Sequence, residues 1–164
     1  MKGITLLAVM ALMVVSCNCQ KKATEQANVT ETATTGSETT NQQNIMPVIE
    51  YEANSRGFFL FVRVENHNLY ISRERDAKKL LKATPINDAD WKEIESLAKA
   101  VNLETVKDLK WPTEKRFYDG AAHANIVFQV NRNRYEAPGF DHGYPPAEIE
   151  KLVNKIVALA EKTQ

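Results

Sequence analysis

The stretch FFLFVRVENHNLYIS, residues 58–72, decides the fold. Its first half alternates in polarity with the period of a strand, and one face carries only apolar side chains: Phe58, Leu60, Val62 and Val64. A turn follows at Asn66-His67-Asn68, because Asn tolerates positive φ. Residues 69–73 then return as the second arm of a β-hairpin.

Further strands are predicted on both sides of this hairpin. Residues 48–54 alternate weakly and predict a strand before it. A second hairpin is predicted after residue 123, with a turn at Asn131-Arg132-Asn133 and a returning strand over residues 134–137. The apolar face of its first strand is formed by Ala124, Ile126, Phe128 and Val130.

Two amphipathic helices complete the pattern. Asn87 or Asp88 caps the first, whose apolar stripe is Trp91, Ile94, Leu97, Ala98 and Val101. Pro145-Pro146 opens the second, whose stripe is Ile149, Leu152, Val153, Ile156, Val157 and Ala160. A short helix is expected over residues 103–109. The sequence therefore predicts a single α+β domain with an antiparallel sheet of about five strands, built as two hairpin-plus-helix units with the helices packed on one face.

The large aromatic side chains outside these stripes have two interpretations. Phe59 and Phe61 lie opposite the apolar face of their strand, so either other elements cover them, which we favour, or they form an exposed patch for a partner. Trp91 begins a regular apolar stripe. We therefore expect Trp91 and Trp111 to anchor the core rather than to form a platform for carbohydrate.

The predicted domain occupies residues 47–164 of a chain of 164 residues, which is an ordinary size for one domain. It contains no cysteine, so apolar packing must stabilise it. The chain has 21 basic and 21 acidic residues, and this balance offers no basic field for nucleic acid. Residues 17–46 are rich in Thr, Gln, Asn and Glu and poor in large apolar side chains, which predicts a disordered tether.

The N-terminal segment carries an export pattern. Lys2 precedes an apolar run from Ile4 to Val15, which has the length of a signal peptide core and is too short to span a bilayer. The boundary Val14-Val15-Ser16-Cys17 resembles the lipobox of bacterial lipoproteins. The resemblance implies a signal peptide over residues 1–16 and a lipidated Cys17, with palmitate among its acyl chains. The alternative is an ordinary secretory signal in which Cys17 is incidental, and Cys19 has no expected role.

This resemblance also implies a location. A chain lipidated at Cys17 belongs to the cell envelope and is held on a bacterial membrane, with the outer membrane or a periplasmic face favoured and display on the cell surface the further option. More than one acyl chain gives stable anchoring, since a single chain holds only marginally.

Candidate site residues gather in two loops, residues 116–123 and 140–144. Because the strands that they flank form a hairpin, the two loops should meet at one end of the sheet. His123 has the parity of Asn125 and Gln129, so we expect it to point away from the core. The candidate ligand-binding residues are Arg56, Tyr118, Asp119, His123, Asp141 and His142.

Four of these side chains have the chemistry of a metal site. Asp119, His123, Asp141 and His142 are ligand types that zinc, iron or manganese accept, although their spacing matches no known signature. Acid–base chemistry by a histidine and an aspartate is a second interpretation, but no obvious nucleophile joins them. Ser55 would lie nearby only if the second strand ran alongside the fourth in the right direction. The third interpretation is structural, with the aspartates bonding backbone N–H groups and the histidines packing.

No catalytic signature supports an enzyme. The sequence lacks H-E-x-x-H, G-x-S-x-G, G-x-G-x-x-G, C-x-x-C, P-loop and EF-hand motifs. We therefore expect a non-enzymatic binding or interaction module, attached to a membrane by lipid, whose partner is an envelope protein or a small ligand and not nucleic acid. The alternative is a metal-dependent or acid–base enzyme that uses the two Asp-His loops. No cofactor is predicted beyond a divalent metal in that alternative.

Overall fold

A computed structural model describes residues 46–76 and 81–163. The expected signal segment, Cys17, Cys19 and nearly all of the expected tether lie outside these residues. Within them, no helix combines the length and the apolar character needed to cross a membrane.

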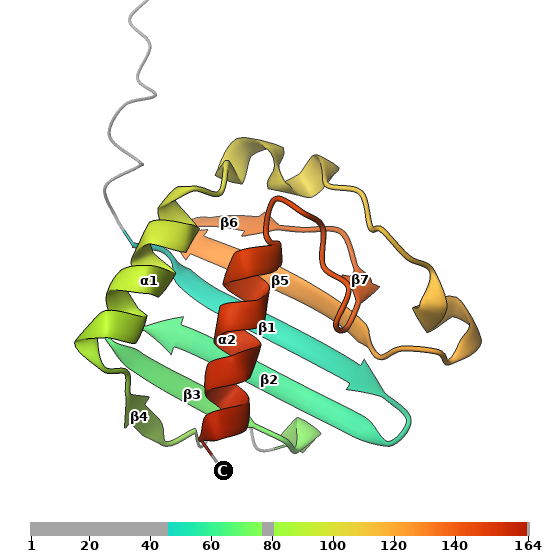
Figure 1. Ribbon diagram of the computed structural model, residues 1–164, viewed down its shortest axis with the longest axis horizontal. Helices are drawn as coiled ribbons and strands as arrows, with labels where there is room; N and C mark the ends of the chain where they lie inside the picture. Colours follow the sequence, from blue (N-terminus) through green and yellow to red (C-terminus); the bar gives the residue numbers. More distant parts are fainter. Residues whose placement is uncertain (1–45, 77–80, 164) are drawn as a thin grey trace, which may run out of the picture. The chain divides into compact units, whose positions relative to one another are not determined.

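The described residues form an α+β fold in which two main helices lie across one face of an open antiparallel sheet (Figure 1). The sheet has seven strands. In chain order the elements are β1 (Val48–Ser55), β2 (Phe58–Glu65), β3 (Asn68–Ser72), β4 (Ala83–Pro85), α1 (Asp88–Lys99), the 3₁₀ helices η4 (Leu103–Asp108) and η5 (Lys115–Tyr118), β5 (His123–Val130), β6 (Asn133–Glu136), β7 (Phe140–Asp141) and α2 (Glu150–Lys162). The predicted fold class is confirmed.

The strand order is β4-β3-β2-β1-β5-β6. β6 pairs with the end of β5, and β7 pairs with the start of β5. The first four strands form a meander, and the chain then passes over the sheet through α1 to place β5 on the free side of β1. Both predicted hairpins are present. The prediction of about five strands missed β4 and β7, because strands of three and two residues are too short to show an alternating pattern.

Local signals explain the turns and helix ends. Asn66 and His67 both have positive φ, 49° and 62°, in the tight turn between β2 and β3, and Asn131 has φ 56° in the second hairpin. Asn87 caps α1 by accepting a hydrogen bond from the N–H of Asp90. The prolines do not open α2 directly. A turn from Pro146 to Ile149 intervenes and the helix begins at Glu150, so the predicted start was too early.

The core lies between the helices and the face of the sheet that they cover. Strand alternation places Ile49, Tyr51 and Ala53 of β1 opposite Val64, Val62 and Leu60 of β2, and all six are buried. The buried stripes of α1 and α2 pack on this face as predicted, Trp91 included.

Two aromatic predictions have opposite outcomes. Phe59 and Phe61 lie on the side of the sheet away from the two helices, and both are buried. The Arg75 guanidinium lies 5.5 Å from the centre of the Phe59 ring. The prediction that these rings are covered is confirmed. Trp111, expected in the core, is 42% exposed, and that prediction was wrong. It lies in a segment with no regular strand or α-helix, where an apolar residue has no periodic face to direct it inward.

Candidate functional site

The two candidate loops meet at the end of the sheet where β5 begins. His123 pairs with Asn54 of β1 on one side and with Asp141 of β7 on the other. The N–H of His142 also donates to the carbonyl of Ala122 at 2.9 Å. The prediction that these loops are neighbours is confirmed, because the antiparallel register leaves them no other arrangement.

The side chain of Asp141 connects β7 with the loop that precedes β5. Its side chain is fully buried, and its carboxylate accepts hydrogen bonds from the Thr113 hydroxyl, the Lys115 N–H at 2.6 Å, the Arg116 N–H at 3.0 Å and Arg116 Nη1 at 2.9 Å. Burial alone would raise the pKa of Asp141, but these bonds lower it to about 2. The carboxylate therefore stays charged and ties residues 113–116 to β7.

His142 lies on the helix-covered side. The buried Tyr51 hydroxyl forms a hydrogen bond of 2.6 Å with His142 Nδ1, and the His142 ring lies 5.0 Å from the ring of Phe58. Burial lowers the pKa of His142, and the charge of Glu161 opposes this effect only in part, so the neutral ring is favoured. Burial likewise raises the pKa of Tyr51.

His123 projects from the opposite face of the sheet. It is exposed, as its strand parity predicted, and its ring covers Gly139 so closely that a Cβ there would lie 2.5 Å from His123 Nε2. Its cross-strand neighbour Asn54 has the opposite parity to Tyr51, which holds His142. The two histidines are therefore separated by the sheet.

This arrangement does not assemble the four candidate metal ligands. Within residues 46–76 and 81–163 no three His, Cys, Asp or Glu side chains are grouped so that they could hold a metal ion. Asp141 bonds an arginine, a threonine and two backbone N–H groups, and the hydrogen bond of His142 is with Tyr51. Neither the metal-site interpretation nor the paired Asp-His interpretation gains support, whereas the structural interpretation describes both residues.

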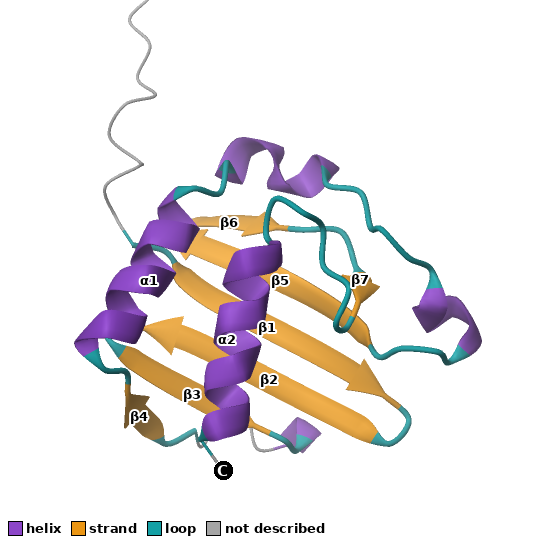
Figure 2. Cartoon of the chain, in the orientation of Figure 1, coloured by secondary structure: helices purple, strands orange, loops and turns teal. Residues whose placement is uncertain are grey.

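Two of the other candidates, Arg56 and Asp119, border an open cleft of about 340 Å³ beside the β1–β2 turn. Arg56 and Asp119 face it from opposite loops, together with Ser55, Gly120, Ala121 and Ala122. The Tyr118 ring packs over Gly120, where a Cβ would lie 2.9 Å from its Cε2 atom. Asp119 has φ 60°, a conformation that aspartate adopts more readily than most residues. The antiparallel pairing of β1 with β5 brings these loops together (Figure 2).

Exposed aromatic side chains gather next to this cleft. The large hydrophobic residues that are exposed in the described part of the chain are Trp111 (42%), Phe117 (67%), Tyr118 (70%) and Tyr144 (42%). We call these four residues the aromatic loop surface. Cations contact three of the rings: the Arg116 guanidinium lies 5.0 Å from the Trp111 centroid and 4.3 Å from that of Phe117, and Lys115 Nζ lies 3.7 Å from that of Tyr144.

Sequence reasoning found only Tyr118 among these four residues. The available signal was the segment WPTEKRFY, residues 111–118, which mixes aromatic and basic residues without strand or helical periodicity. Such a segment cannot bury its rings through a regular face. An exposed aromatic loop was therefore open to inference before the structure.

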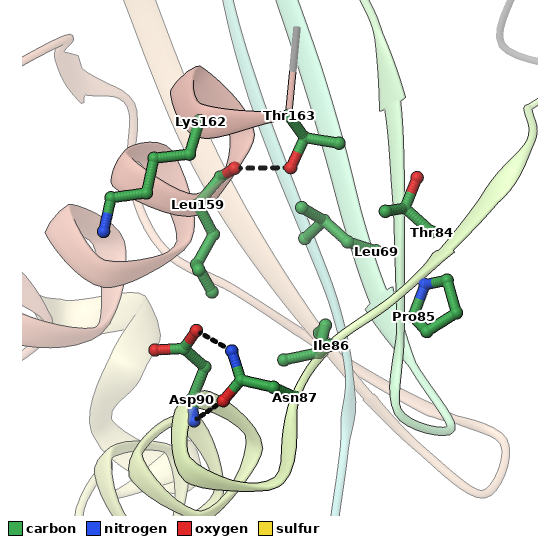
Figure 3. A pocket seen from close by; sticks show the side chains of 9 residues that line it. All are labelled: Leu69, Thr84, Pro85, Ile86, Asn87, Asp90, Leu159, Lys162 and Thr163. Atoms are coloured by element: carbon green, nitrogen blue, oxygen red, sulfur yellow. Dashed lines mark hydrogen bonds between the residues drawn. The ribbon is translucent and has the colours of Figure 1, made fainter.

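A second hollow lies on the other side of the domain, between the end of α2 and the β3–β4 edge (Figure 3). Its volume is about 220 Å³, and it is lined by Leu69 of β3, Ile86 between β4 and α1, and Leu159 of α2. The Asp90 carboxylate at its rim is engaged by Asn87 and by Lys155 Nζ, the latter at 2.6 Å. None of the candidate residues from the sequence lies here.

The structure thus divides the six candidate ligand-binding residues. Arg56 and Asp119 line the open cleft, Tyr118 packs over Gly120 of its lining, and His123 is the first residue of β5. Asp141 and His142 do not line the cleft, and their side chains form hydrogen bonds with Lys115 and Tyr51. Comparison with known proteins gives no match to any protein family, curated protein or solved structure.

Proposed function

We propose that this protein is a lipoprotein of the bacterial cell envelope, anchored on a membrane through Cys17, and that it acts as a non-enzymatic binding module. Its partner is another envelope protein, which it contacts through the aromatic loop surface. The anchor follows from the resemblance of residues 14–17 to a lipobox. The tether over residues 17–46, with a typical reach of about 30 Å, holds the domain clear of the lipid headgroups.

The aromatic loop surface carries the proposal. Tryptophan, tyrosine, phenylalanine and arginine are the side chains most enriched at the centres of protein interfaces, and large aromatic rings there often dominate the binding free energy. Phe117 and Tyr118 are each more than two-thirds exposed, which leaves most of their apolar area to be buried by a partner.

The support beneath these rings strengthens the case. Asp141 holds residues 113–116 through two backbone N–H groups and two side chains, so the aromatic residues are displayed on a positioned loop. A surface that is already positioned loses less conformational entropy when it binds. In the described residues, no comparable observation favours the enzymatic alternative.

The binding surface is tested by photo-crosslinking in intact cells. A photoreactive benzoylphenylalanine in place of Phe117 should yield a discrete protein adduct, and the adduct should disappear when Trp111→Ala is added. The same group in place of Lys92, an exposed residue of α1, is the matched control and should yield none. An adduct at position 117 that persists with Trp111→Ala, or no adduct beyond that of the control, contradicts the proposal.

The anchor is tested by metabolic labelling with a clickable palmitate analogue. The full chain should be labelled and sediment with membranes, and Cys17→Ser should abolish both properties. Cys19→Ser is the matched control, because it changes the neighbouring thiol, and should leave both intact. Equal labelling of the Cys17→Ser and native chains would show that the anchor is elsewhere.

A further inference from the structure

Arg116 has a hydrogen-bonding group that the fold does not use. Its side chain is only 4% exposed. Nη1 donates to Asp141 Oδ1 at 2.9 Å and to the Thr113 carbonyl at 3.1 Å. Nε is buried and has no hydrogen-bond partner among the described residues. A buried donor without an acceptor is costly, so an unpartnered N–H of a charged group needs an explanation.

The position of this N–H connects it with the aromatic loop surface. The guanidinium lies near the rings of both Trp111 and Phe117, at 5.0 and 4.3 Å from their centroids. Both rings are exposed, and Phe117 is 67% exposed, so its ring has room to turn outward. A group that displaces the Phe117 ring can therefore approach the Arg116 guanidinium from the aromatic loop surface.

The chemistry of that edge selects the entering group. Guanidinium N–H groups are arranged as a planar fork that matches the two oxygens of a carboxylate, and charge-assisted hydrogen bonds of this kind are about twice as strong as neutral ones. Asp141 already occupies Nη1 on one side, which leaves the Nε side for a second carboxylate. Lys115 adds a positive charge at the rim, and interaction with the Tyr144 side chain raises its pKa.

We propose that Arg116 Nε is the docking point for a carboxylate of the partner protein, which enters between Trp111 and Phe117. The recognised feature is thus an aspartate or glutamate side chain in an acidic segment of the partner. This inference rests on the proposed function, since it names the chemistry of the partner that binds the aromatic loop surface.

The test follows the Nε–Hε resonance of Arg116 in the full chain, labelled with ¹⁵N-arginine and held in a nonionic detergent. Arg116→Lys identifies this resonance by its loss. The probe is a short blocked peptide of alternating Glu and Gly, and the comparison peptide carries Gln in place of Glu. Acetate and inorganic phosphate are two further arms, which separate a carboxylate from a general anion.

We expect the Arg116 Hε resonance to shift with the Glu peptide and with acetate and to stay in place with the Gln peptide. Arg116→Lys keeps a cation beside Asp141 and should bind the Glu peptide at least about tenfold more weakly. Arg132→Lys, in the exposed turn between β5 and β6, is the matched control and should bind with native affinity.

Three results would overturn the inference: an unmoved Hε resonance at the highest Glu peptide concentration, equal shifts with the Gln peptide, or a shift with phosphate alone. None of them contradicts the proposed function if the adduct from position 117 still forms in cells, because the surface then binds a protein without placing a carboxylate at Arg116. Loss of that adduct removes the proposed function and this inference with it.

Discussion

Asp141 and Lys155 each join two parts of the protein by charge, but their surroundings differ. The Asp141 carboxylate is fully buried and accepts two backbone N–H bonds besides its contacts with Arg116 and Thr113. Lys155 connects α2 with α1 at the surface. Its Nζ lies 2.6 Å from Asp90 Oδ1 and also contacts Glu93, whose side chain is 54% exposed.

The difference shows which contact positions a structural element. Water and salt screen the Lys155 pairs, and the two helices are already held by their apolar stripes on the sheet. The segment around Lys115 has no such stripe, and the apolar residues of η5, Phe117 and Tyr118, are exposed. Directional hydrogen bonds to one buried carboxylate therefore replace apolar packing there, and they leave the neighbouring aromatic rings exposed.

Removing the Asp141 carboxylate should have the largest effect on stability. Asp141→Ala leaves the buried Arg116 charge and two backbone N–H groups unpaired, and we expect it to lower the free energy of unfolding by about 3–5 kcal/mol. Urea denaturation monitored by circular dichroism measures this change. Lys155→Met removes the surface pairs and should give a value close to that of the native protein. Equal losses in the two variants would contradict the comparison.

Lowering the pH should separate the contributions of Asp141 and His142 to the free energy of unfolding. The folded pKa of Asp141, about 2, lies below its ordinary value of 3.8, so its stabilisation is complete above that value and is lost as the pH falls toward 2. The pKa of His142 is lowered below 6.5 in the folded state, so protonation of this group already favours unfolding in milder acid.

Unfolding free energies of the native protein and of Asp141→Asn, measured across this pH range, test the assignment. The difference between them should shrink only below about pH 4, as the native carboxylate becomes protonated. Asp119→Asn is the control, because Asp119 is exposed and asparagine also tolerates its positive φ. A difference that already shrinks in milder acid would assign the loss to another group.

A smaller effect is expected from Tyr51→Phe, which removes the hydroxyl that is hydrogen-bonded to His142 Nδ1. The loss should be about 0.5–1.5 kcal/mol, the usual net contribution of one hydrogen bond. Amide hydrogen exchange at Lys115 and Arg116 should stay slow, because their N–H groups bond Asp141 and not His142. Faster exchange at these two amides would show that His142 helps to hold the loop.

The smallest effect on stability should come from the most exposed rings. Phe117→Ala combined with Tyr118→Ala should change the free energy of unfolding by no more than about 0.5 kcal/mol, since neither ring is part of the core. The same double variant should abolish co-purification of the partner after crosslinking from position 111. Retained co-purification would separate these rings from binding.

The regular elements were predictable because their signals are local. The alternation of residues 58–65 and the stripe from Trp91 to Ala98 depend on the geometry of one strand or one helix, and both appear where the pattern placed them. By contrast β4 and β7 are strands only because β3 and β5 supply their hydrogen-bond partners. No periodic pattern can announce an element of two or three residues.

The candidate site divides in the same way. Its location at the start of β5 followed from hairpin geometry, which makes His123 and Asp141 neighbours whatever their side chains do. One interpretation had Asp141 bonding backbone N–H groups, but the identity of its donors did not follow, because they belong to residues 113–116, more than two dozen positions earlier in a segment without periodicity. The prediction that Trp111 lies in the core failed for a related reason. Only the path of that segment in the folded protein decides whether the Trp111 ring is covered.

The order of the longer strands and the two main helices, and the face that each presents to the core, are written in short-range patterns of this sequence. The proposed export signal rests on a pattern of the same kind. The tertiary structure alone decided that Asp141 would bind a loop rather than a ligand, that His123 and His142 would lie on opposite sides of the sheet, and that the Trp111–Tyr118 segment would display its rings. Short-range patterns report the conformation of neighbouring residues, whereas these three outcomes depend on which distant groups meet after the sheet has formed.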